Sequence, residues 1–165
     1  MKARTIQKSI EINAPKEVVW DVMLHDIFTR IWYKAFSEGA HAVTDWKRGS
    51  KAVFKDNSGN GIVGRVIENQ LYEVVAVVYE GLVVKGEEEY ESEQARQVQG
   101  ARETYRLTEK AGLTQLAITS DMAPECYDTM SVAWDNALRH IQILAESNGE
   151  PAINDFAARK TDAKA

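Results

Sequence analysis

Residues 124–147 have the sequence PECYDTMSVAWDNALRHIQILAES, and this stretch decides the fold. Its apolar side chains recur at steps of three and four residues, which predicts one long helix with a broad buried face. This apolar stripe consists of Tyr127, Met130, Ala133, Trp134, Ala137, Leu138, Ile141, Leu144 and Ala145. Pro124 suits a first helical position, and Gly149 with Pro151 favours a helix end just beyond Ser147. At ~1.5 Å per residue the helix is about 36 Å long, so it needs a broad apolar surface to pack on.

The chain before this helix is expected to supply that surface as a β-sheet. Residues 5–12 alternate between apolar and polar side chains, which is typical of a half-buried strand. Asn13-Ala14-Pro15 then ends this strand and begins a first short helix, and residues 26–36 predict a second one. The next expected strands are Ala40–Trp46, Lys51–Lys55, Ile62–Glu68, Leu71–Glu80, Ala101–Glu109 and Leu113–Asp121.

Two segments between these strands leave the strand count open. Residues 81–90 either extend the strand that ends at Glu80 or pair beyond it, and residues 91–100 are polar and predict a loop. Sequential hairpins give an antiparallel sheet. The predicted fold class is therefore α+β, with a curved antiparallel sheet of about six to seven strands around a long C-terminal helix. Two short helices follow the first strand.

Composition limits the class of protein. The chain has 165 residues, 44% apolar and 27% charged, which is globular composition. This length predicts one domain, at residues 1–149, followed by a polar tail at residues 150–165. The net charge of −5 argues against nucleic acid as a partner. No run approaches about 18 apolar residues, and the N-terminus lacks the apolar core of a signal peptide. With a single cysteine, Cys126, these features predict a cytoplasmic protein without membrane contact.

Three features could indicate chemistry, and each favours a structural interpretation. Residues 59–64 spell G-x-G-x-x-G, but they belong to hairpin-turn sequence and a strand follows, whereas a dinucleotide site opens a helix. Glu87-Glu88-Glu89 is an acidic run that favours a solvated loop over a cation site. The three histidines are isolated in sequence, although Asp21 or Asp26 lies near His25. The sequence therefore predicts no cofactor, no metal site and no catalytic residues.

Short motifs, in order along the chain, resemble one superfamily. The matching segments are residues 12–20 (INAPKEVVW), 48–50 (RGS), 61–68 (GIVGRVIE) and 112–116 (GLTQL), together with Trp32, Trp134 and Leu138. They resemble the START-like, or SRPBCC, helix-grip superfamily. Within it the chain is similar to the branch named for the C-terminal domain of the activator of Hsp90 ATPase homologues. One departure is Tyr33, where this branch commonly has a second tryptophan.

The resemblance implies a cavity between sheet and helix, because many relatives bind apolar small molecules there. We expect a non-enzymatic protein that binds a small apolar or lipid-like molecule. The expected ligand-binding residues are Trp32, Tyr33, Phe36, Tyr79, Tyr105, Met130 and Trp134. The competing interpretation is that these side chains fill a solid core.

Two alternative functions stay open. One is a protein-interaction module that acts on a chaperone, as the name of the branch suggests. The other is an enzyme of the cyclase or hydrolase kind, which would need a histidine–carboxylate pair facing the cavity. A homodimer is left open as well.

Overall fold

The computed structural model describes residues 3–147, so the expected helix stop at Gly149 and Pro151 and the tail at residues 150–165 lie outside the described residues. The strands are β1 (Arg4–Ile12), β2 (His41–Val43), β3 (Lys51–Lys55), β4 (Gly61–Gln70), β5 (Val74–Val84), β6 (Glu87–Glu89), β7 (Arg102–Lys110) and β8 (Leu113–Met122). The helices are α1 (Lys16–Leu24), α2 (Asp26–Trp32), α3 (Glu93–Val98) and α4 (Tyr127–Glu146), with the 3-10 turns η1 (Tyr33–Ala35) and η2 (Pro124–Cys126).

The strands form one antiparallel sheet in the order β1-β8-β7-β5-β4-β3-β2, and β6 adds to β5 as an eighth strand. Register shifts interrupt the pairing of β4 with β5 at Val63/Gly64 and at Val66/Glu68. Such bulges bend a strand and increase its twist. At the first shift, a Cβ on Gly64 would lie 2.4 Å from the backbone oxygen of Val78, so this position requires glycine. The prediction of a curved antiparallel sheet is confirmed.

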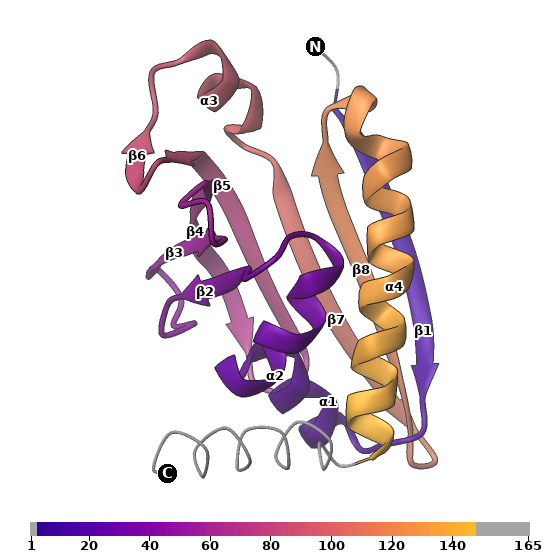
Figure 1. Ribbon diagram of the computed structural model, residues 1–165. Coiled ribbons are helices and arrows are strands. Elements are labelled where there is room, and N and C mark those ends of the chain that lie inside the picture. The colour runs from indigo at the N-terminus through magenta and orange to yellow at the C-terminus, as the bar shows by residue number, and fades with distance from the viewer. Residues whose placement is uncertain (1–2, 148–165) are drawn as a thin grey trace, which may run out of the picture.

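The long helix α4 lies along β1 and β8, with α1 and α2 beside its C-terminal half (Figure 1). The stripe expected from the sequence faces inward: Trp134, Ala137, Ile141 and Leu144 are all buried. A side-chain bond joins the two short helices, because the Trp32 indole N–H donates to the Val22 carbonyl at 2.9 Å. The predicted arrangement of one long helix and two short helices on a sheet is confirmed.

Three expected boundaries are corrected. Residues 91–100 contain the short helix α3, which Ser92 caps by accepting a hydrogen bond from the Ala95 N–H at 3.1 Å, and Ala95 is fully buried. The strand expected at residues 40–46 ends at Val43. The second helix is α-helical only to Trp32 and continues as η1.

The G-x-G-x-x-G segment is a hairpin, as predicted. Gly59 lies in the β3–β4 turn with a φ of 82°, and β4 begins at Gly61, so no helix N-terminus follows the glycines. None of the helices within residues 3–147 combines the length and the apolar composition of a membrane span.

Candidate functional site

A central cavity of about 160 Å³ lies between the sheet, η1 and α4. It is lined by Trp32, Tyr33, Phe36, Ala40, Phe54, Ile62, Tyr79, Glu103, Tyr105, Met130 and Trp134. All seven residues expected from the sequence to bind a ligand are among them. The structure therefore brings these side chains together from α2, η1, the η1–β2 loop, β5, β7 and α4. That they bind a ligand stays a prediction.

Aromatic rings make up most of the cavity wall, and they contact one another. The Trp134 ring lies 5.0 Å from the Phe36 ring and 5.9 Å from the Tyr105 ring, measured between centroids. On the opposite side, the Phe54 ring lies 6.3 Å from Tyr79 and 6.4 Å from Tyr33. These separations are typical of edge-to-face aromatic packing. Each ring is therefore held by its neighbours, which makes the wall of the cavity stiff.

One carboxyl group, that of Glu103, interrupts this apolar wall. Side chains alternate across a strand, so Glu103 shares the inner face of β7 with Tyr105 and Leu107, which are both buried. Two hydroxyl groups donate to its carboxyl oxygens, Tyr105 at 2.5 Å and Ser120 at 3.1 Å. Ser120 is the residue directly opposite Glu103 in the β7–β8 register. Sequence reasoning placed Tyr105 in the cavity and missed Glu103, although the same alternation puts both on one face.

Burial controls the ionisation of these groups. Desolvation raises the pKa of Glu103 above its ordinary value, and hydrogen bonds from Tyr105, Ser120 and Tyr79 offset only part of this rise. Burial and the nearby Glu103 carboxyl also raise the pKa values of Tyr33, Tyr79 and Tyr105. The three phenols therefore stay protonated at neutral pH, and Tyr105 donates its hydroxyl hydrogen to Glu103.

The cavity-lining residue Trp134 has a buried nitrogen without a hydrogen-bond partner among the described residues. Trp134 is only 1% exposed, and no described residue accepts a hydrogen bond from its indole N–H. A buried donor without an acceptor costs about 1–3 kcal/mol.

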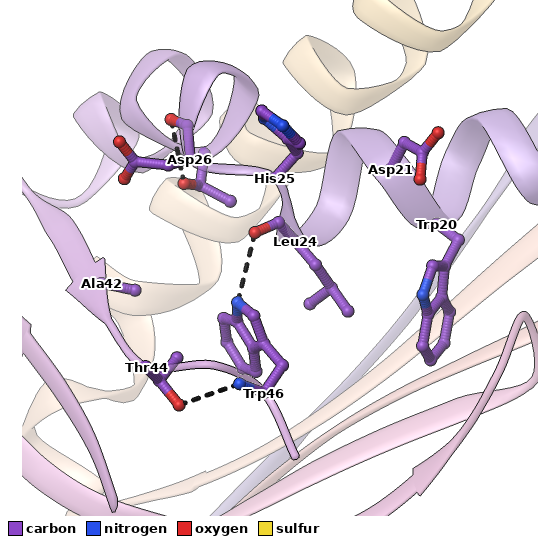
Figure 2. A pocket seen from close by; sticks show the side chains of 9 residues that line it. Trp20, Asp21, Leu24, His25, Asp26, Ala42, Thr44 and Trp46 are labelled. Carbon is purple, nitrogen blue, oxygen red and sulfur yellow. Dashed lines mark hydrogen bonds between the residues drawn. The ribbon is translucent and has the colours of Figure 1, made fainter.

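A second, larger pocket lies between the short helices α1 and α2 and the segment that runs from β2 toward β3, and we call it the outer pocket. Its volume is about 350 Å³, and it is lined by Trp20, Asp21, Leu24, His25, Asp26, Thr29, Ala42, Thr44 and Trp46 (Figure 2). Most of its polar groups bond to the protein itself. His25 Nδ1 accepts from the Ile27 N–H at 3.4 Å, and Asp26 pairs with Arg30 at 2.7 Å. The outer pocket therefore offers a ligand fewer unsatisfied groups than its size suggests.

Trp46 occupies the centre of the outer pocket in an unusual conformation. Its φ of 62° lies in the left-handed region, which bulky residues rarely adopt. Three hydrogen bonds hold it there. Its indole N–H donates to the Leu24 carbonyl at 3.2 Å, its backbone N–H donates to Thr44 at 3.1 Å (Figure 2), and its carbonyl accepts from Asn69 at 2.7 Å. These bonds join the β2–β3 connection to α1.

The structure places no histidine at the central cavity. His25 belongs to the outer pocket, where its Nδ1 caps α2; His41 contacts the Gly39 carbonyl at 3.0 Å, and His140 is exposed on α4. The histidine–carboxylate pair that an enzyme of this kind would need is therefore not formed by the described cavity residues. Within residues 3–147, no three histidine, cysteine or acidic side chains are grouped closely enough to hold a metal ion.

The sequence matches no protein-family model, and no curated protein is significantly similar to it. Its backbone is similar to several solved structures. The Aha1 dimer from Colwellia psychrerythraea is 15% identical with a TM-score of 0.66, and the match covers 87% of this chain and 96% of that one. Protein MLL2253 from Mesorhizobium loti is 14% identical with a TM-score of 0.67, covering 86% and 96% of the two chains. CalU16 from Micromonospora echinospora is 15% identical with a TM-score of 0.61, covering 94% and 87%.

These matches span nearly the whole described chain, and they agree with the resemblance seen in the sequence. At identities of 14–15% they establish architecture. The chain therefore has the helix-grip fold of the Aha1-like, or SRPBCC, proteins.

Proposed function

We propose that the protein binds a compact, mostly apolar small molecule in the central cavity. The observation that carries this proposal is an aromatic cavity containing one hydrogen-bonded carboxyl, that of Glu103. Binding sites for small molecules combine this kind of apolar wall with a few polar groups that fix orientation.

The volume sets the size of the ligand. A cavity of about 160 Å³ is close to the ~150 Å³ apolar cavity that accommodates benzene, and well below the ~300–1,000 Å³ of sites for drug-sized molecules. A single ring with a short substituent therefore fits, whereas a lipid chain requires α4 or η1 to move outward. Met130, which lines the cavity from α4, is the flexible side chain best able to adapt to ligand shape.

Toluene is the probe for this proposal, because it fits the volume and makes no hydrogen bonds. At ten times its dissociation constant it should raise the free energy of unfolding by about 1.4 kcal/mol, or about 3–6 °C in Tm for a protein of this size. Thermal unfolding at increasing toluene concentration measures the shift. Chemical-shift mapping should place toluene at Trp134.

Two alanines provide a matched pair of variants. Ala40 lines the central cavity and Ala42 lines the outer pocket, and both are half-buried. Ala40→Leu should fill the cavity and abolish the toluene shift, whereas Ala42→Leu should retain it. No stabilisation of the wild-type protein, or equal stabilisation of both variants, would reject the central cavity as the binding site.

The interaction module has weaker support. The solved Aha1 structure is a dimer, and a chaperone or a second copy of the chain would need an apolar docking surface. Within residues 3–147, the most exposed large apolar side chains are Val43, Leu71 and Val132. They lie on β2, on the β4–β5 turn and on α4, so they belong to three separate elements. Native mass spectrometry of the purified protein would reveal a dimer and any retained small molecule in one measurement.

A further inference from the structure

The described residues that line the central cavity include one acidic side chain and no basic one. Glu103 is the only acidic residue among those lining it, and among the described lining residues none is lysine, arginine or histidine. The groups that face Glu103 are uncharged. They are Tyr105 from its own strand, Ser120 from β8, Tyr79 from β5 and Tyr33 from η1. From α4 the cavity receives only Met130 and Trp134.

Glu103 is half-buried, and a carboxylate that is partly withdrawn from water gains from a cationic partner, because desolvation of an isolated charge is costly. Hydroxyl groups satisfy two or three of the roughly four acceptor sites on Glu103 and supply no positive charge. At least one acceptor site therefore remains for a donor that enters the cavity. A cationic donor would gain most, because it also neutralises the charge.

The cavity wall favours the same ligand charge. Seven of the lining residues are aromatic: Trp32, Tyr33, Phe36, Phe54, Tyr79, Tyr105 and Trp134. The faces of aromatic rings attract organic cations, and tryptophan does so most strongly. An anion would be repelled by the aromatic ring faces and by the Glu103 carboxylate. The aromatic rings and the carboxyl group therefore both favour a ligand that carries a positive charge on an apolar body.

We infer that the ligand of the central cavity is a compact organic amine, a single-ring body whose protonated amino group pairs with Glu103 between the aromatic faces. This inference rests on the proposed function. An ammonium group has three donors and no acceptor, so it fits a wall of acceptors and ring faces.

Three probes of nearly equal size test the charge: benzylamine, benzyl alcohol and benzoate. Calorimetric titration of the full chain at neutral pH should give benzylamine an affinity at least about tenfold above that of benzyl alcohol, as expected for a buried charge pair. Benzoate should bind most weakly. Equal affinities for the amine and the alcohol, or tightest binding of benzoate, would overturn the inference.

Two variants separate the carboxyl from general charge effects. Glu103→Gln keeps the shape and removes the charge, so the amine-to-alcohol preference should fall to about one while benzyl alcohol binding changes by less than about threefold. Glu87→Gln removes the same charge from an exposed position of β6 and should leave the preference unchanged. A preference that persists in Glu103→Gln overturns the assignment. If that variant fails to fold, the three probes on the wild-type chain decide.

The toluene experiment distinguishes a failure of the amine inference from a failure of the proposed function. Toluene stabilisation without any amine preference rejects the amine and leaves the binding cavity standing. If neither toluene nor any of the three charged and uncharged probes binds the wild-type protein, the proposed function fails and the amine inference fails with it.

Discussion

The central cavity and the outer pocket differ in how their polar groups are satisfied. The outer pocket is larger, at about 350 Å³ against about 160 Å³, yet its Trp46 indole donates to the Leu24 carbonyl and its His25 caps a helix. In the central cavity the Trp134 indole has no acceptor. Glu103 there is surrounded by neutral hydroxyls. Volume alone would select the outer pocket, whereas an aromatic wall around one carboxyl group selects the central cavity.

The difference has a physical origin in the two linings. Backbone carbonyls and N–H groups at helix and strand ends border the outer pocket, so its side chains find partners nearby. The central cavity is bordered on the sheet side by β3, β4, β5 and β7 and on the helix side by α4, where most backbone groups are already paired, and η1 and the η1–β2 loop complete its wall. A polar side chain that reaches this region can bond only to another side chain or to a ligand. Polar side chains in the central cavity therefore lower the stability of the fold. Such a loss of stability is typical of binding sites.

The largest expected effect compares one tryptophan from each region. Trp134→Ala should lower the free energy of unfolding by about 3 kcal/mol, the low end for a buried tryptophan because a cavity already adjoins it. Trp46→Ala should cost about 1 kcal/mol, since Trp46 is half-buried and loses mainly one hydrogen bond. Urea unfolding monitored by far-UV circular dichroism measures both. Equal costs would mean that the central residues pack no differently from those of the outer pocket.

The sequence predicted the seven central residues but not the polar group that they surround. Periodicity places Trp134 and Met130 on the inner face of α4, and alternation places Tyr105 inside the sheet, so local patterns were sufficient for these residues. Glu103 obeys the same alternation, but a charged residue inside a core is unexpected unless paired. Its partners, Ser120 and Tyr79, lie on other strands, and their proximity depends on the register.

Elements whose stability depends on distant contacts were also the least predictable. Helix α3 was expected to be a loop because its sequence is polar; the local signal was Ser92, a typical N-cap. The end of β2 at Val43 depends on Trp46, which is held by Leu24 of α1 and Asn69 of β4. By contrast, β3 at Lys51–Lys55 is bounded by turn sequences on both sides and matches its expected limits.

The second prediction concerns the pH dependence of stability. Burial raises the pKa of Glu103 above its ordinary value of 4.5, so the folded state holds this proton to a higher pH than the unfolded state. The resulting stabilisation is complete below the unfolded pKa and is lost as the pH rises through the folded pKa. Glu103→Gln cannot titrate. The free energy of unfolding of Glu103→Gln minus that of the wild-type protein should therefore increase from acidic to neutral pH.

Urea unfolding at several pH values measures this difference, and Glu87→Gln on the exposed strand β6 serves as the control for the loss of charge itself. A difference that decreases as the pH rises would mean that Glu103 is stabilised as a carboxylate. In that case the hydrogen bonds that Glu103 accepts would outweigh its desolvation, and the comparison between the two pockets would have to be revised.

The smallest expected effect tests the strain in the outer pocket. Trp46 has a φ of 62°, where glycine is free of strain and alanine is not. At most other positions, a protein with glycine is less stable than the same protein with alanine by ~0.4–1 kcal/mol, because glycine gives the unfolded chain more conformational freedom. At position 46 this order should reverse, with Trp46→Gly more stable than Trp46→Ala by about 0.5–1 kcal/mol. Both variants lack the indole, so the comparison cancels the hydrogen bond to Leu24 and isolates the backbone. If Trp46→Ala is the more stable of the two in urea unfolding, the surrounding fold does not impose the left-handed conformation. The indole bond to Leu24 would then be what holds residue 46 in it.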